Sequence, residues 1–507
     1  MRLYEGVASN LRRSVIHSAL SPSDVALQRF FSLQRLAIFF CLWLAMGIWY
    51  WSSLAQGDPI DRLSSPKDTL LLVCERDLSY YDGIAETAPS WRQFNYWLFG
   101  TPAAKFASYD LAFKELISWY QDQQQTANSQ DLLSIHLSHL ILLAENDQVE
   151  KALSSLPSLG EGERADISQR AFRHAYDNDT PISQSDWAVV SDLLGEGWFA
   201  NHLLLRSAEQ FDDLARIEKY KHELIQEAST RITQSAIYLI LAFVPIVLGL
   251  IFIGRFFSHA NNRTVNNLSM RKHHYFSAWS LFQGAGIFFR SQIWWMGYFL
   301  VLSLLLTRFY WLYDFNFLWI WGGLLAALPM LYLMHKYLLQ PRQLTLVSAF
   351  GLSPSKFGYW RLVKWSAALL AIDAVLNMII GWLLYRVGYQ SPLLESVSEY
   401  LLWSSPIDTI LEMISVVVWA PLLEEILFRG LVYLSLRAVL RPVPAIIISA
   451  AIFSALHFYS FVGFVSVFIA GAIWAWAYER CRSLLPGIIA HSFSNLFWAI
   501  TILLYYR

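Results

Sequence analysis

The chain has 507 residues, of which 55% are hydrophobic and 16% aromatic, while only 15% are charged. Soluble proteins carry roughly 25% charged residues, so this composition excludes an ordinary soluble protein and is typical of a membrane protein. The 38 Lys and Arg residues balance the 39 Asp and Glu residues, which excludes the basic field that nucleic-acid binding needs. The three cysteines are too few and too dispersed for a disulfide framework or a thiolate metal site.

The chain begins with residues 1–35, which contain five arginines, and continues with an apolar run at residues 36–51. This run lacks the small-residue cleavage site and the short apolar core of a secretory signal. The sequence therefore predicts a cytoplasmic N-terminal segment (1–35) and an uncleaved membrane anchor (36–51).

Residues 52–232 are polar and include stretches such as YQDQQQTANSQD, which could not lie in hydrocarbon. Apolar residues recur there at steps of three and four, as in DLAFKELISWY, which is the pattern of an amphipathic helix. We expect a soluble α-helical insert, in which no catalytic or metal-binding motif is visible.

Eight further apolar runs follow the insert. They lie at residues 236–253, 293–306, 318–334, 365–384, 407–436, 443–458, 461–477 and 485–504. Several reach the 17–25 residues that a membrane-spanning helix needs. The predicted fold class is an all-α polytopic membrane helix bundle of about nine spans, with spans 2–5 in residues 233–399 and a C-terminal membrane core in residues 400–507.

Lys and Arg in short loops collect on the cytoplasmic side of a membrane. Here they gather in the N-terminal segment, in the loops 255–290 and 336–364, and in the turns 437–441 and 480–482. A nine-span topology places all of these on one side. The sequence thus predicts a multi-pass protein of the cell membrane with a cytoplasmic N-terminus and an extracytoplasmic insert.

Ionisable side chains inside membrane spans are costly, and they mark functional sites by default. The densest group lies in the segment PLLEEILFRG. The candidate residues are Glu424, Glu425, Arg429, His457, His491 and Asn495. Another polar pair, Asp373 and Asn377, has a simpler explanation as a structural contact between helices.

Helix geometry separates the roles of the two adjacent glutamates. Glu425 and Arg429 are four residues apart and share a helix face, so they are expected to form an ion pair. Glu424 lies about 100° around the helix from its neighbour, so it stays available as a general base. His491 and Asn495, also four residues apart, offer two neighbouring hydrogen-bond donors.

Three motifs occur in order on separate apolar runs: Glu424-Glu425-x-x-x-Arg429, Phe453-x-x-x-His457 and His491-x-x-x-Asn495. In this pattern the chain resembles the CAAX-protease and bacteriocin-processing group of intramembrane proteases, which includes the type II CAAX prenyl endopeptidases. The resemblance covers roughly residues 400–507. It does not include the first anchor or the insert.

The resemblance implies an intramembrane endopeptidase that hydrolyses peptide bonds of membrane-embedded or membrane-tethered substrates. Glu424, assisted by His457, would activate a water molecule, and His491 with Asn495 would bind the tetrahedral oxyanion. Glu425 and Arg429 would support the site structurally.

Two alternatives remain open at this stage. Glu424, His457 and His491 could also ligate zinc, although the resemblance favours a metal-independent glutamate mechanism and no cofactor is firmly predicted. The second alternative is a non-catalytic protein of the same fold, such as a scaffold, an immunity factor or a transporter-like protein. The expected partners are the lipid bilayer, a peptide substrate and a protein that binds the insert.

Overall fold

A computed structural model describes residues 32–55, 60, 63–122, 129–177, 182–263, 279–309, 317–389, 392, 395 and 397–507. Of the residues that the structure describes, 86% are helical and none is in a strand, so the predicted all-α class is confirmed. Most of the predicted cytoplasmic segment 1–35 lies outside the described residues.

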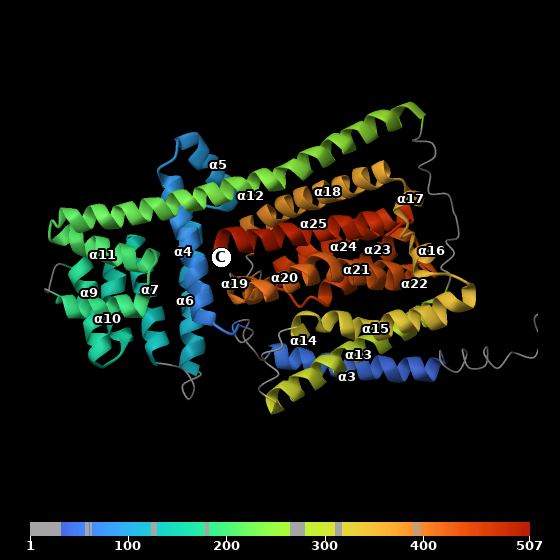
Figure 1. Ribbon diagram of the computed structural model, residues 1–507, viewed down its shortest axis with the longest axis horizontal. Coiled ribbons are helices and arrows are strands. Elements are labelled where there is room, and N and C mark those ends of the chain that lie inside the picture. Colours follow the sequence, from blue (N-terminus) through green and yellow to red (C-terminus); the bar gives the residue numbers. More distant parts are fainter. Residues whose placement is uncertain are drawn as a thin grey trace, which may run out of the picture.

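The polar part of the chain folds into a compact group of helices (Figure 1). These are α4 (Pro66–Ala85), α5 (Pro89–Phe99), α6 (Pro102–Asp122), α7 (Ser129–Glu145), α8 (Val149–Ser154), η2 (Leu156–Leu159), α9 (Glu163–Tyr176), α10 (Gln184–Leu194) and α11 (Trp198–Gln210). Except for α5, which contributes no residue to it, these helices enclose a hydrophobic core of their own, which includes Leu70, Phe113, Leu137, Phe172 and Leu203. This helical group therefore buries enough apolar surface to form a core apart from that of the membrane helices.

The remaining helices form a second bundle (Figure 1). They are α3 (Leu33–Ala55), α12 (Leu214–Arg263), α13 (Leu281–Arg308), α14 (Phe317–Ile320), α15 (Gly322–Met334), η5 (His335–Leu339), η6 (Gln340–Arg342), α16 (Leu346–Phe350), α17 (Pro354–Phe357), α18 (Tyr359–Arg386), α19 (Glu399–Trp403), α20 (Pro406–Ile414), η7 (Ser415–Trp419), α21 (Ala420–Glu424), η8 (Glu425–Tyr433), α22 (Leu434–Arg437), α23 (Pro442–Ala455), α24 (Phe461–Cys481), α25 (Leu485–Thr501) and η9 (Ile502–Tyr506).

Six helices in the described part of the chain are long and apolar enough to cross a membrane. They cover Leu214–Gly254, Leu281–Leu306, Gly322–Arg342, Tyr359–Arg386, Phe461–Cys481 and Leu485–Tyr506. The protein is therefore a multi-pass membrane protein. Two shorter apolar helices, Leu33–Ile48 and Pro442–Ala455, account for two further predicted runs, and the run at 407–436 is a series of short α- and π-helical segments. The count of nine spans stays a prediction.

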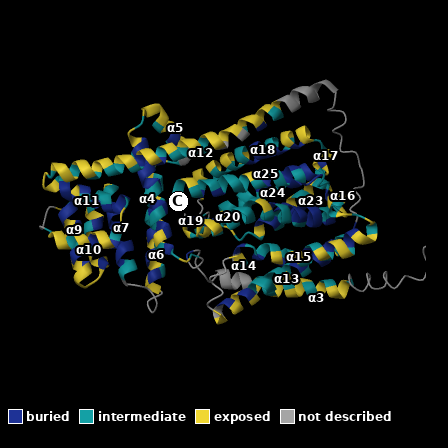
Figure 2. Ribbon diagram, viewed as in Figure 1, coloured by how far each residue is buried: buried dark blue, intermediate teal, exposed yellow. Residues whose placement is uncertain are grey.

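Figure 2 shows how burial follows this arrangement: exposed residues cover one side of α12 and α18. Ile240 and Phe243 of α12 are 63% and 45% exposed although both are strongly apolar. Large apolar side chains that face outward are stable only against lipid or another apolar surface. The exposed face of the bundle is thus suited to the hydrocarbon of a bilayer.

One helix joins the two bundles. α12 is 50 residues long; it packs against α4 and α11 and then runs along α18 (Figure 1). It passes residue 232, the predicted end of the insert, without a break. At the C-terminal end of the insert, continuous helix therefore connects it to the membrane bundle.

Side-chain contacts also fasten the insert to the ends of the membrane helices. The Glu399 carboxylate accepts hydrogen bonds from the backbone N–H groups of Ser64 (2.6 Å) and Ser65 (3.0 Å), which precede α4. The Arg231 guanidinium of α12 donates to the Tyr505 carbonyl at 3.0 Å. These contacts hold α4 and α12 against α19 and η9.

Candidate active site

The segment that carries both glutamates has an irregular hydrogen-bond pattern. η7 and η8 are π-helices, in which the backbone bonds i→i+5 instead of i→i+4. The Ala420 N–H donates to the Ser415 carbonyl in this register. Short π-helical stretches inside α-helices are frequent at functional sites, and here they flank α21, at whose end Glu424 lies.

The structure brings three of the four predicted catalytic side chains together. Glu424 Oε2 lies 3.9 Å from His457 Nε2 and 3.8 Å from His491 Nε2. These distances are too long for direct hydrogen bonds. They suit groups that act together on a small molecule placed between them.

A hydrogen bond of Nδ1 sets the orientation of the His457 ring. Its Nδ1 lies 2.8 Å from the Phe453 carbonyl, one helical turn earlier. A carbonyl can only accept, so Nδ1 carries the proton and donates. In the neutral ring Nε2 is therefore a proton acceptor, and it faces Glu424.

Glu425 and Arg429 form the expected pair. Arg429 Nη1 lies 2.9 Å from Glu425 Oε1, and both side chains are almost completely buried. Arg429 Nη2 also donates to the Gly471 carbonyl at 3.0 Å, and its guanidinium carbon lies 4.3 Å from the centre of the Phe453 ring. The pair thus links η8 to α23 and α24.

Two glycines permit the close approach of the neighbouring helices to this pair. A Cβ atom at Gly471 would lie 3.1 Å from Arg429 Nη2, and a Cβ atom at Gly487 would lie 3.2 Å from Glu425 Oε2. A side chain at either position would require its neighbours to shift by a few tenths of an ångström. Close packing around the pair therefore depends on these small residues.

His491 is held from several sides. Its ring stacks on Trp474 with centroids 4.1 Å apart, and its Nδ1 lies 3.5 Å from Glu425 Oε1. The side chain is 5% exposed, against 29% for Glu424. The imidazole is consequently fixed, with Nε2 directed to Glu424.

Asn495 makes a contact that the motif alone did not predict. Its Nδ2 donates to the Val416 carbonyl of η7 at 2.7 Å. In the π-helical register this carbonyl would receive the N–H of residue 421, but Pro421 has no N–H. Asn495 supplies the missing donor and so fastens α25 to the segment that leads to Glu424.

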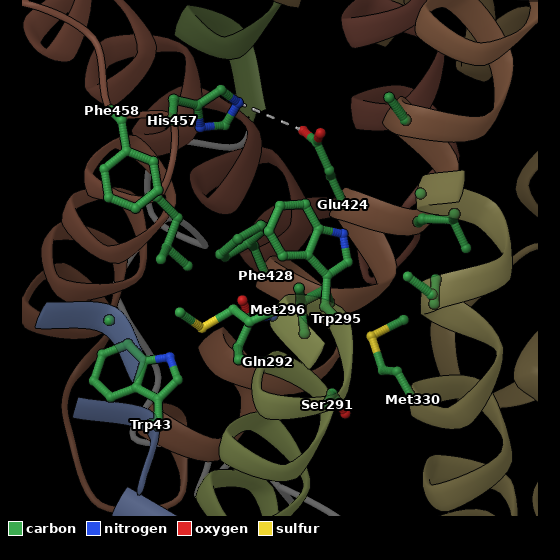
Figure 3. Close-up of a pocket in the computed structure, with 18 of the residues that line it drawn as sticks. Trp43, Ser291, Gln292, Trp295, Met296, Met330, Glu424, Phe428, His457 and Phe458 are labelled. Atoms are coloured by element: carbon green, nitrogen blue, oxygen red, sulfur yellow. Dashed lines mark ion pairs between the residues drawn. The ribbon is translucent and has the colours of Figure 1, made fainter. Parts of the chain in front are cut away.

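Glu424 and His457 line one end of a cavity of about 630 Å³ (Figure 3). Its walls come from α3, α13 and α15 as well as from η7, α21 and η8. The sequence did not predict that α3, α13 and α15 contribute to the cavity, because the residues of these helices that line it carry no charge. Polar residues at membrane depth in α13, such as Gln292, were the signal that could have revealed them.

Asp373 and Asn377 have the structural role that the sequence suggested. Asp373 Oδ1 accepts a hydrogen bond from Asn377 Nδ2 at 2.9 Å, and Ser494 Oγ donates to Asp373 Oδ2 at 3.2 Å. Asn377 Oδ1 in turn accepts from Ser466 Oγ at 2.8 Å. The four side chains tie α18 to α24 and α25.

The zinc alternative has no support from the donor set. Within the described ranges, no group of three or more His, Cys, Asp or Glu side chains is arranged to hold a metal ion. We therefore derive no chemical step through a metal.

Comparison with known proteins gives one match. Residues 406–497 match the family model for type II CAAX prenyl endopeptidase Rce1-like proteins. No match was found among curated proteins or among solved structures. The matched segment contains all three motifs and begins at α20, so α3, the insert, α13 and α15 lie outside it.

At the level of the family, the match supports a CAAX-type protease. The resemblance predicted from the three motifs is thereby confirmed: residues 406–497 of this chain are similar to the type II CAAX prenyl endopeptidases.

Proposed function

We propose that the protein is an intramembrane endopeptidase that hydrolyses peptide bonds by means of a water molecule activated by Glu424 and His457. The observation that carries the proposal is the position of the Glu424 carboxylate, 3.9 Å and 3.8 Å from the Nε2 atoms of His457 and His491, at the end of an apolar cavity. The similarity of residues 406–497 to a protease family supports it.

The first step is attack by water. A water molecule between Glu424 and His457 donates one hydrogen bond to the Glu424 carboxylate and one to His457 Nε2, which is a proton acceptor because Nδ1–H is bonded to Phe453. Both bonds increase electron density on the water oxygen, which attacks the peptide carbonyl carbon while Glu424 takes a proton.

The second step is stabilisation and collapse of the intermediate. With the His491 proton on Nε2, the oxyanion accepts one hydrogen bond from this nitrogen and another from the second N–H of Asn495, whose other N–H donates to Val416. The C–N bond then breaks, and Glu424 returns its proton to the leaving amine. Hydrogen-bond donors that are already in position stabilise an oxyanion most where water is excluded. His491 is buried enough to meet this condition.

The Glu425–Arg429 pair is assigned to support. With its charge compensated by Arg429, Glu425 need not act as a base, and the pair holds η8 in place next to Glu424. Neither glutamate is assigned as a zinc ligand, and we expect hydrolysis without a bound metal.

Two further assignments extend the proposal to the whole chain. The N-terminus is cytoplasmic and the helical insert is extracytoplasmic, because the cations of the short loops gather on one side. The substrates are peptides embedded in or tethered to the membrane, and the insert binds a protein partner.

The proposal is tested in cells by mass spectrometry of membrane proteins. Cells with the Glu424→Ala protein are compared with wild type and with Glu412→Gln, a carboxylate on the preceding helix that does not line the cavity. We expect uncleaved precursors to accumulate only with Glu424→Ala. Identical peptide patterns in all three strains, with the phenotype intact, would favour the non-catalytic scaffold instead.

A further inference from the structure

The cavity beside Glu424 is built largely by helices outside the matched segment. One wall comes from Trp43, Gly47 and Ile48 of α3, from Ser291, Gln292 and Met296 of α13, and from residues 323–330 of α15. The opposite wall comes from η7, α21, η8 and the end of α23. Figure 3 shows the Glu424–His457 pair at one end of the cavity, Trp43 toward the other, and Gln292 and Met296 between them.

The lining is apolar with few polar side chains, and the two serines among them are already satisfied. Ser291 Oγ donates to the Ile287 carbonyl at 2.7 Å, and Ser415 Oγ donates to the Ile320 carbonyl at 3.0 Å. The half-buried Gln292 carboxamide, like the buried Nε1 of Trp419 in the same lining, makes no hydrogen bond to any residue in the described part of the chain. It lies eleven residues into α13, about 16 Å from the helix start at 1.5 Å per residue.

An unpaired carboxamide in an apolar cavity is unfavourable, and so is an unpaired peptide group in the same place. A glutamine side chain offers one acceptor and two donors, which matches the C=O and N–H of an extended backbone. A hydrocarbon chain has no group that could pair with it. The polarity of Gln292 therefore favours a peptide occupant over a lipid tail.

We propose that this cavity is a substrate subsite that binds an extended, uncharged peptide segment, whose backbone pairs with the Gln292 carboxamide and whose large apolar side chain fills the space between Gly47 and Gly323. The proposal rests on the proposed peptidase function and assigns its specificity to α3, α13 and α15. Gln292 is a positioning residue, since it lies away from the reacting atoms.

The two glycines show where the side chain of the peptide is accommodated. A Cβ atom added at Gly47 or at Gly323 would meet no atom within 4 Å, although both residues line the cavity. The cavity is thus wide at these positions, and a larger residue there would occupy the subsite without disturbing the helix packing.

The experiment measures binding, so it does not depend on hydrolysis. The full-length Glu424→Gln protein, reconstituted in bilayers, is exposed to a synthetic Leu/Ala peptide with lysines at both ends and one photoactivatable leucine. A photoactivatable palmitate serves as the lipid probe. After irradiation, mass spectrometry maps the labelled residues.

We expect the peptide to label the lining residues of α3, α13 and α15. Labelling should fall about tenfold in Gln292→Met, because a lost hydrogen bond leaves a backbone group unpaired, and it should return in part with Gln292→Asn. Gly323→Leu should block labelling, whereas Gly381→Leu, at an equally open glycine outside the cavity, should not. Palmitate labelling should be unchanged by Gln292→Met.

Two results would overturn the proposal. One is palmitate labelling of the cavity lining while the peptide labels only the outer surface, which would make the cavity a lipid site. The other is equal peptide labelling of wild-type Gln292 and Gln292→Met. A failure of the peptidase function would appear separately, as unchanged proteolysis in Glu424→Ala cells.

Discussion

The hydrogen bond from Asn495 to Val416 allows the structural and the catalytic contribution of one residue to be separated. Asn495→Ala removes the donor that satisfies the Val416 carbonyl at 2.7 Å. Pro421→Ala restores the backbone N–H of residue 421. In the π-helical register, this N–H would donate to the Val416 carbonyl. The two substitutions together form a double-mutant cycle.

The magnitudes differ for the two roles. A buried carbonyl that loses its partner costs about 1–3 kcal/mol of stability, and hydrogen bonds between membrane helices average about 0.6 kcal/mol, so we expect a loss of roughly 1–2 kcal/mol in Asn495→Ala. Loss of one oxyanion donor lowers the rate by about 10²–10³. In the Pro421→Ala background the stability loss should largely disappear, while the rate loss should remain.

The assay combines thermal unfolding in detergent or bilayers with cleavage of a substrate identified from accumulated precursors. All four proteins of the cycle are measured: wild type, both single variants and the double variant. A stability loss of the same size in both backgrounds would refute the proposed link between Pro421, Val416 and Asn495. A rate loss that also vanishes with Pro421→Ala would mean that Asn495 only positions η7 and does not bind the oxyanion.

Three further predictions concern other parts of the molecule. Arg429→Ala should lower the free energy of unfolding by about 3–5 kcal/mol, because it leaves Glu425 charged, buried and unpaired; thermal unfolding checks this, and a loss below 1 kcal/mol would contradict it. In the insert, burial alone would lower the pKa of His202, but the hydrogen bonds with Asp82 and Glu145 outweigh it and raise its pKa to about 9. Since the pKa of His202 in the folded protein exceeds its ordinary value of 6.5, this stabilisation is complete below pH 6.5 and is lost as the pH rises through 9. Limited proteolysis of the insert should accelerate over that interval, and His202→Gln should abolish the pH dependence. Peptidase activity should survive stringent chelation, and a loss that zinc restores would reinstate the metal mechanism.

The sequence predicted several of the side-chain contacts at the candidate site because these contacts are local. The Glu425–Arg429 pair joins residues four apart on one helix, and the Phe453–His457 contact joins residues four apart at the end of α23. The order of the motifs indicated which helices must meet. Membrane composition and helical periodicity likewise predicted the class of fold.

Other features depend on packing between segments that are far apart in the sequence. The bond from Asn495 to Val416 replaces one that Pro421, just after the π-helix η7, cannot donate. No periodicity distinguishes a π-helix from an α-helix over so few residues. The stacking of Trp474 on His491 and the contribution of α3 to the cavity wall depend on how helices separated by long stretches of chain come together. Apolar lining residues of this kind cannot be told from lipid-facing ones by sequence alone.

The role of Glu424 is tested most directly by the rate of peptide-bond hydrolysis by purified Glu424→Gln protein, which keeps the shape of the side chain and removes its basicity. The mechanism predicts a fall of about 10²–10⁴ in rate, with an unfolding temperature close to that of wild type and of the Glu412→Gln control. Hydrolysis at the wild-type rate by a correctly folded Glu424→Gln protein would contradict the assignment of Glu424 as the base that activates water.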